Sequence, residues 1–128
     1  MITDWEEFPN FTEDEFRCSH TGEQQMKTGF VRKLQALRVA YGKPMTITSG
    51  YRSPEHPIEA RKAKPGSHAS GRAVDIAVSG EDAFFLLEKV FESGCFSGVG
   101  VNQRGDHGQR FIHLDDLDTE TRPTVWSY

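Results

Sequence analysis

The chain has 128 residues, a net charge of −4 with histidine neutral, and 36% hydrophobic residues. This length fits one domain over residues 1–128 with a single core, and the scattered basic residues lack the positive stripe of a nucleic-acid-binding protein. No segment approaches the roughly 20 apolar residues of a membrane span. Residues 1–7 are acidic and lack the basic and apolar regions of a signal peptide. We expect a monomer made in the cytoplasm, with no nucleic-acid or membrane partner.

The first part of the chain predicts two helices followed by a strand. Residues 12–16 resemble the start of a short helix, with Thr12 as the N-cap. Apolar residues recur at helical spacing over residues 30–41, and Gly42 is a stop signal. Residues 45–48 alternate and are partly β-branched, which favours a strand.

The middle of the chain predicts a loop, a strand and a further helix. Residues 54–71 contain three Pro and two Gly, which indicates a loop with one helical turn near residues 58–62. Residues 72–78 alternate as a strand, with Asp75 on one face and Val74 on the other. A helix then begins near residues 79–82 and ends at Gly94. Its expected apolar face consists of Phe84, Leu87, Val90 and Phe91.

The last part predicts two more strands, at residues 98–101 and 110–115, separated by a polar loop. Trp126 is expected to pack back on the sheet. Together the elements predict an α+β fold with a small antiparallel sheet and flanking helices.

Two cysteines do not make a disulfide framework. A bond between Cys18 and Cys95 stays open, although Cys95 is expected to be a buried free thiol. Cys18 and His20 could form half of a zinc site, but no second Cys/His pair completes it.

Polar residues on apolar strands mark a candidate metal site. Asp75 lies in the strand at 72–78, seven residues after His68, and His113 lies in the strand at 110–115. An isolated buried charge is costly, so Asp75 must be paired, metal-bound or at the edge of a site. Two His and one Asp would leave one tetrahedral position of a Zn²⁺ ion for water, as in catalytic sites, where the metal acidifies the water and polarises a carbonyl.

Each residue also has a simpler interpretation. His68 could be hydrogen-bonded at the junction of loop and strand, and His113 could be a satisfied core histidine. Asp75 could cap a turn or pair with Arg52 or Arg72. Spacing alone leaves these alternatives open.

The segment His68-x-x-Gly71-x-Ala73-x-Asp75, followed by His113 on a later strand, resembles the M15 peptidases. These include zinc D-Ala-D-Ala carboxypeptidases, phage endolysins that cut L-Ala-D-Glu bonds, and murein endopeptidases. The resemblance covers most of residues 11–115. It implies a hedgehog/D-Ala-D-Ala peptidase-like zinc domain in which His68, Asp75 and His113 bind Zn²⁺.

The segment Ser49-Gly50-Tyr51-Arg52-Ser53 looks like the substrate-binding segment of the same family. By that resemblance Ser49, Tyr51 and Arg52 contact the substrate, and Arg52 binds a carboxylate or carbonyl and stabilises the oxyanion. A planar guanidinium matches a carboxylate, and a fixed positive charge helps where negative charge develops.

The general base of the family is missing from its usual positions. Many M15 members place an acidic residue three positions before the second zinc His, or a His two before. Those positions hold Arg110 and Phe111 here. Many members also have Ser where this chain has Gly66.

Other residues near His113 are candidates for the catalytic base. Asp115 shares a strand face with His113 but could equally orient it. Asp106 and His107 precede the strand, and a histidine side chain suits proton transfer at neutral pH. His56 is a further candidate, although all the loop residues could simply be solvated.

The resemblance implies a zinc-dependent peptidase acting on peptidoglycan stem peptides or crosslinks, and it suits a phage or prophage enzyme that reaches the cell wall after release or delivery. A non-catalytic zinc module that binds peptide or a virion partner is the alternative, favoured by the missing base. A hydrolase of another small amide is a third hypothesis.

Overall fold

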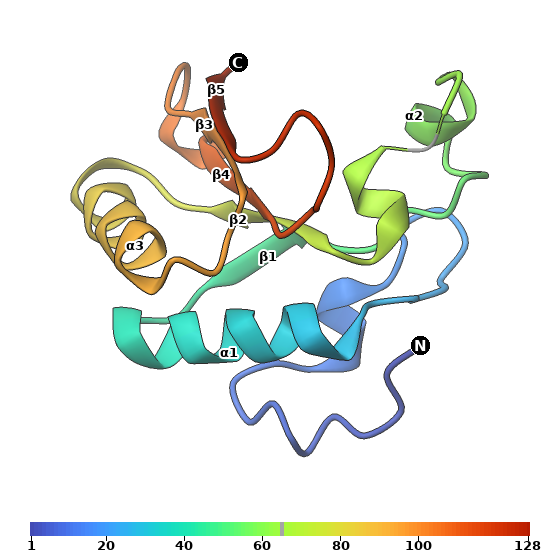
Figure 1. The fold of residues 1–128 in the computed structure, drawn as a ribbon, viewed down its shortest axis with the longest axis horizontal. Coiled ribbons are helices and arrows are strands. Elements are labelled where there is room, and N and C mark those ends of the chain that lie inside the picture. The colour runs from blue at the N-terminus through green and yellow to red at the C-terminus, as the bar shows by residue number, and fades with distance from the viewer. Residues whose placement is uncertain (65) are drawn as a thin grey trace.

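The computed structural model describes residues 1–64 and 66–128, so Pro65 of the predicted loop at 54–71 lies outside the described residues. A five-stranded sheet forms the centre of the molecule, in the order β1-β2-β4-β3-β5 (Figure 1). Its strands are β1 (Thr46–Ser49), β2 (Ala73–Ala77), β3 (Gly98–Asn102), β4 (Phe111–Asp115) and β5 (Thr124–Ser127).

The α+β class and the small sheet with flanking helices are confirmed, but the sheet is mixed. β1 pairs with β2, β2 with β4, and β3 with β4, all antiparallel as predicted. β5 pairs with β3 in parallel, which corrects the expectation of a purely antiparallel sheet. The reason is that the chain returns past the sheet after β4 before it adds the edge strand, instead of turning back in a hairpin.

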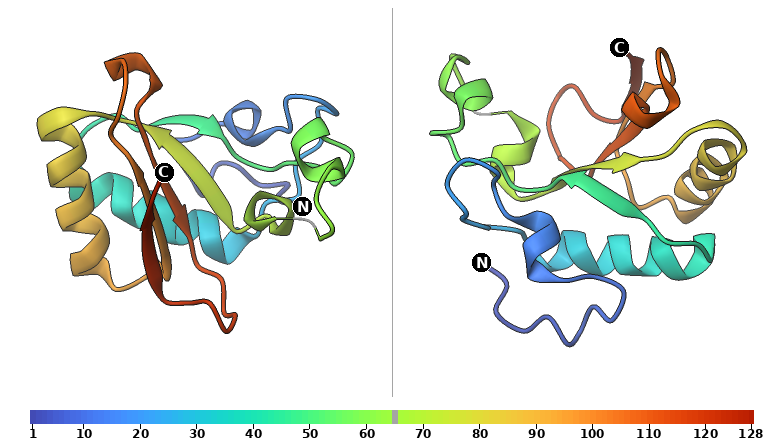
Figure 2. Two further views of the ribbon diagram at one scale, coloured as in Figure 1. Left: turned by 90° about the horizontal axis from the view of Figure 1, so that it is seen from above. Right: turned by 180° about the vertical axis from the view of Figure 1, so that it is seen from behind.

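Two long helices, α1 (Thr28–Tyr41) and α3 (Gly80–Ser93), lie together to one side of the sheet (Figures 1 and 2). Gly42 ends α1 in the left-handed conformation, with φ 78°. The remaining helical elements are short: η1 (Glu13–Phe16), α2 (Pro57–Ala60), η2 (Ser67–Ser70) and η3 (His107–Gln109). Among the described residues, no helix has both the length and the apolar character needed to cross a membrane.

Side chains alternate between the two faces of β2 and β4, so one face belongs to the hydrophobic core and the other carries the candidate site. Val74, Ile76, Ile112 and Leu114 are at most 1% exposed and pack in the hydrophobic core with α1 and the N-terminal segment. Neighbouring residues of a strand point to opposite faces, so Asp75 and His113 project from the other face. Their Cα atoms are register partners across β2 and β4.

Two predictions about the helices need correction. The Thr12 side chain makes no cap, and η1 is a single 3-10 turn. In α3 the buried residues are Ala83, Leu86 and Val90, whereas Phe84 and Phe91 of the expected apolar face are exposed. The five consecutive apolar residues 83–87 point in all directions around the helix, and the face that is buried is rotated by about one residue from the predicted one.

The cysteines are both free thiols, and Cys95 is half-buried where a buried thiol was expected. Cys18 is buried in the core, where its sulfur accepts a hydrogen bond from the Ser53 amide at 3.4 Å. Trp126 packs on the sheet as predicted, within β5.

Candidate metal centre

Local structure explains why the chain carries His68, Gly71 and Asp75 at these three positions. His68 lies in η2, which ends at Gly71 with φ 76°. A Cβ at Gly71 would overlap the Gln25 carbonyl oxygen, so this backbone conformation and close approach both require glycine. β2 begins at Ala73 and brings Asp75 to the middle of the sheet.

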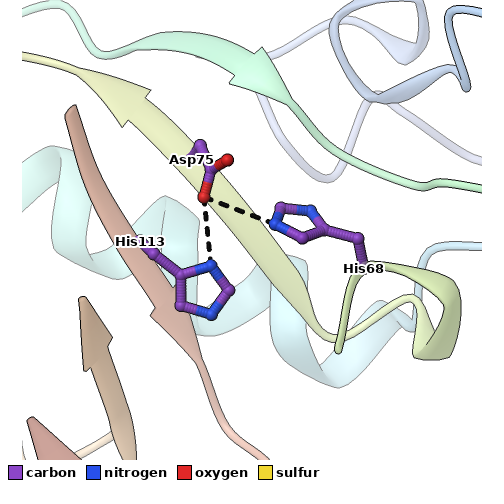
Figure 3. A group of neighbouring side chains, drawn as sticks. All are labelled: His68, Asp75 and His113. Atoms are coloured by element: carbon purple, nitrogen blue, oxygen red, sulfur yellow. Dashed lines mark hydrogen bonds and ion pairs between the residues drawn. The ribbon is translucent and has the colours of Figure 1, made fainter. Parts of the chain in front are cut away.

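His68, Asp75 and His113 converge on one point, as Figure 3 shows. The Nε2 atom of His68 lies 3.3 Å from Oδ1 of Asp75, and Nδ1 of His113 lies 3.0 Å from the same oxygen. One ligand atom from each residue lies within 4.8 Å of the others. Tetrahedral zinc with bonds of about 2.0–2.1 Å separates its ligand atoms by roughly 3.3 Å, so this spacing suits a single ion.

The backbone carbonyl of Gly50 fixes the tautomer of His68. Nδ1 of His68 lies 2.9 Å from this oxygen, which can only accept a hydrogen bond. Nδ1 of His68 therefore carries a proton, and Nε2 is the ring nitrogen that faces Asp75. The His68 carbonyl in turn accepts a hydrogen bond from the Arg52 amide at 3.2 Å, so this segment and the Gly50–Arg52 segment hold each other.

His113 is held between two carboxylates. Its Nδ1 faces Asp75, and its Nε2 lies 2.8 Å from Oδ2 of Asp115. Asp115 is fully buried, and the Arg122 guanidinium donates to both of its oxygens, at 2.9 and 2.8 Å. With the Asp115 carboxylate fixed, the Nε2–H of His113 has a defined acceptor and Nδ1 is oriented toward His68 and Asp75.

The charges of the centre follow from burial and these contacts. Burial opposes ionisation of Asp75, but hydrogen bonds with His113 and His68 outweigh it and lower the Asp75 pKa well below its usual range. The pKa of Asp115 is also lowered, because its hydrogen bonds with His113 and Arg122 outweigh the opposing effect of burial. Burial lowers the pKa of His113, yet Asp115 and Asp75 reverse this and raise it. Both carboxylates are thus ionised at neutral pH.

A divalent cation fits this donor set. Two imidazole nitrogens and one carboxylate oxygen face one another there, so a single cation could bind all three. His68 and His113 are 5% and 3% exposed, so water compensates poorly. Imidazole nitrogens and carboxylate oxygens are the ligands that zinc takes in catalytic sites.

Arg52 lies beside the candidate metal centre. Its Nη2 is 3.7 Å from Oδ2 of Asp75, and its Nη1 is 3.6 Å from Oε2 of the buried Glu59. These are ion pairs too long for good hydrogen bonds, so the N–H groups remain available to a ligand. The alternative pairing of Asp75 with Arg72 is not formed, because Arg72 binds Asp116.

A cavity of about 210 Å³ opens next to Arg52, and a second of about 300 Å³ contains Asp75. Ser49 lines both cavities, and its Cα pairs with that of Asp75 across β1 and β2. Tyr51 lines the first cavity, although its side chain is only 7% exposed and packs in the core. Ser49 and Arg52 therefore border the metal centre, whereas Tyr51 reaches only the first cavity.

The candidates for the base lie in different surroundings. Asp115 contacts the ring nitrogen of His113 that points away from Asp75, and both of its oxygens are bonded. Asp106 and His107 are exposed at the start of η3, where their carbonyls accept backbone hydrogen bonds. His56 lies on the rim of the first cavity, 3.3 Å from the Ser19 hydroxyl.

Four further residues at the site were not predicted. Arg122 binds Asp115, and its guanidinium lies 5.0 Å from the Trp126 ring centroid. The Trp126 ring in turn lies 5.2 Å from that of His113. Glu59 supports Arg52, and Tyr128 contacts Phe111. The only signal in the sequence was the aromatic end of the chain, since nothing in the spacing of Arg122 indicates that it reaches Asp115.

Comparison with known proteins gives one family. The family model described as Peptidase M15 matches residues 9–115, which is most of the chain. A search of curated proteins found no significant match. The matched residues contain His68, Asp75, His113 and the segment around Arg52, in the geometry described above. The chain therefore belongs to the M15 peptidase family.

Proposed function

We propose that the protein is a zinc-dependent peptidase that acts on the stem peptides or crosslinks of peptidoglycan, as a D-Ala-D-Ala carboxypeptidase or an L,D- or L-Ala-D-Glu endopeptidase. The observation that supports it best is the convergence of His68, Asp75 and His113 beside the guanidinium of Arg52. Membership of the M15 family supports a peptidase. The resemblance to compact phage endolysins supports a lysis enzyme of a phage or prophage.

In this proposal, Nε2 of His68, Oδ1 of Asp75 and Nδ1 of His113 would hold the zinc ion. A zinc ion in such a site supplies Lewis-acid polarisation of a carbonyl and lowers the pKa of a water molecule. Asp115, fixed by Arg122, keeps the proton of His113 on Nε2 and orients the ring. We assign Asp115 this orienting role, because its oxygens are already occupied.

Arg52 would bind the substrate. Its Nη2 lies beside Asp75 and its Nη1 beside Glu59, both beyond good hydrogen-bond distance, so these two carboxylates hold the charge in place while the N–H groups can turn to a ligand. A guanidinium so placed can bind a peptide carboxylate or stabilise the negative charge that develops on the scissile carbonyl oxygen. Peptidoglycan stems offer free carboxylates, which is why we favour them over other peptides.

Turnover of purified murein tests the proposal. The zinc-loaded protein should release peptide fragments that mass spectrometry identifies, a chelator should abolish the release, and added Zn²⁺ should restore it. Fragment masses would identify the scissile bond. A folded, zinc-loaded protein that cleaves neither murein nor a panel of dipeptides with D- and L-residues would refute the peptidase.

A non-catalytic zinc module is the second candidate. It is favoured by Arg110 and Phe111, which occupy the positions where relatives carry a proton-transfer group. This candidate predicts zinc binding and peptide binding without cleavage, so the murein experiment separates the two.

A further inference from the structure

The strand β5 lies beyond residues 9–115, the part that matches the family, yet it borders the metal centre. Asp75 is the register partner of His113, His113 of Gly100, and Gly100 of Trp126. A Cβ at Gly100 would lie 2.7 Å from the Trp126 ring, so the absence of a side chain there lets the indole lie against His113. Asp75, His113 and Trp126 therefore lie in one row across the sheet.

Tyr128 belongs to the next row on the same face. It lies two residues beyond Trp126, and its amide continues the ladder with a hydrogen bond to the Val101 carbonyl at 3.4 Å. Its ring contacts Phe111, with 5.0 Å between the ring centroids. Phe111 stands two residues before His113, where related peptidases carry a histidine that transfers protons. Tyr128 thus brings a polar group to a position that lacks one.

The hydroxyl of Tyr128 is within electrostatic reach of the centre. Burial raises its pKa, a hydrogen bond from Trp126 lowers it, and the charges of Asp75 and Arg52 act in opposite directions, with a net raised pKa. The hydroxyl therefore keeps its proton at neutral pH and can donate it in a hydrogen bond.

A ligand can reach this hydroxyl. Tyr128 is 50% exposed. Phe111, on which its ring rests, lines the same cavity as Asp75 and Ser49. The core face of the sheet, which carries Val74 and Ile112, packs against α1, whereas Asp75 and His113 lie on the other face, where the Trp126 ring contacts His113.

We propose that Tyr128 is a further substrate-contacting residue, whose hydroxyl donates a hydrogen bond to the oxygen that becomes negatively charged at the metal centre, opposite Arg52. This role rests on the proposed peptidase function. It assigns to β5 a part of the site that the family match does not include.

The test compares Tyr128→Phe with Tyr41→Phe. The first variant keeps the ring on Phe111 and removes only the hydroxyl. The second removes a hydroxyl that donates to the Asp82 carbonyl at 3.3 Å, between α1 and α3. We expect Tyr128→Phe to lower kcat on murein by ~10²-fold with unchanged zinc content and melting temperature, and Tyr41→Phe to keep wild-type kcat.

Binding of inorganic phosphate, a tetrahedral oxyanion, gives a second readout that needs no turnover. In calorimetric titrations of the zinc-loaded proteins, Tyr128→Phe should bind phosphate on the order of 10-fold more weakly than the wild type or Tyr41→Phe. Equal phosphate affinity in the three proteins would overturn the role of Tyr128, as would wild-type kcat in Tyr128→Phe. An inactive wild type would refute the peptidase instead, while the phosphate titration would still judge Tyr128.

Discussion

His113 uses its two ring nitrogens for different partners, and this division explains why an apolar strand carries two polar residues. Nδ1 faces Asp75, while Nε2 is bonded to Asp115, which Arg122 holds. His68 is arranged in the same way, with Nδ1 on a backbone carbonyl and Nε2 toward Asp75. Each histidine is thus fixed by one nitrogen and leaves the other for the ion.

Asp115→Asn tests the orienting role. The amide keeps the shape but replaces the charge and places an N–H group beside His113 or Arg122. We expect zinc affinity to fall by roughly 10- to 100-fold and the free energy of unfolding by about 1–3 kcal/mol, measured by chelator competition and by denaturant titration. Asp106→Asn, in the exposed loop, is the control. Unchanged zinc affinity in a folded Asp115→Asn protein would rule the role out.

Arg52→Ala separates substrate binding from metal binding. The residue contacts Asp75 only through Oδ2, whereas Oδ1 faces the histidines. We expect stoichiometric zinc and a loss of kcat/KM of about 10²–10³-fold on murein. Arg104→Ala, an exposed arginine of the loop before η3, should leave both unchanged. Wild-type kinetics for Arg52→Ala would refute its role.

At the scale of elements, the loop between β1 and β2 positions both His68 and Arg52. Glu59 of α2 is 2% exposed and accepts hydrogen bonds from the Gly66 amide at 2.6 Å and from Lys62 at 2.9 Å. Gly71 ends η2 against residues 25–26. These contacts determine where the loop lies above the sheet.

Gly71→Ala tests the importance of the close approach between Gly71 and the Gln25 backbone. Gly71 and Gly105 both have φ +76°, but a Cβ at Gly105 meets open space, whereas one at Gly71 meets the Gln25 backbone. Alanine at either position should cost about 1–2 kcal/mol for the left-handed conformation. Gly71→Ala should cost more and should also weaken zinc binding, because His68 shifts. Equal losses of stability in thermal melts, with equal zinc affinity, would contradict the packing argument.

The pH dependence of the stability of Glu59→Gln tests the role of the buried Glu59 carboxylate. Burial raises the Glu59 pKa, but Lys62 and the Gly66 amide outweigh it and, with Arg52, lower the pKa; the neighbouring His56 also faces it. A depressed folded pKa stabilises the protein above the unfolded value of about 4.3. That contribution disappears as pH falls through the folded pKa. The variant should melt below the wild type at pH 7, and the gap should narrow under acid conditions. A gap that is constant from pH 7 to pH 3 would exclude this linkage.

The sequence predicted the elements that local pattern specifies and missed those that depend on tertiary packing. The His68–Asp75 segment was identifiable because its residues are close in sequence and each has a local cause. The predicted packing face of α3 was only partly right: Val90 is buried and Leu87 packs on the core, but Phe84 and Phe91 are exposed, because the apolar residues 83–87 point in all directions around the helix. Arg122 and Tyr128 reach the site only because β5 returns in parallel beside β3, a long-range pairing that no local pattern specifies.

At the scale of the whole molecule, the candidate ligands come from three parts of the fold. His68 lies in η2, Asp75 in β2 and His113 in β4. A shared ion would join the loop after β1 to the centre of the sheet, so its binding free energy would also stabilise the fold. Metal binding and the position of Arg52 would thereby be coupled, since the His68 carbonyl and the Arg52 amide are hydrogen-bonded.

X-ray absorption at the zinc edge tests the central claim most directly. The purified protein should hold one zinc per chain, with only nitrogen and oxygen ligands at about 2.0–2.1 Å, two of them imidazoles, and His113→Ala should lose the ion. Two results would contradict the assignment. One is a sulfur ligand at about 2.3 Å, which would have to come from a residue such as Cys18 or Cys95. The other is full zinc occupancy in His113→Ala.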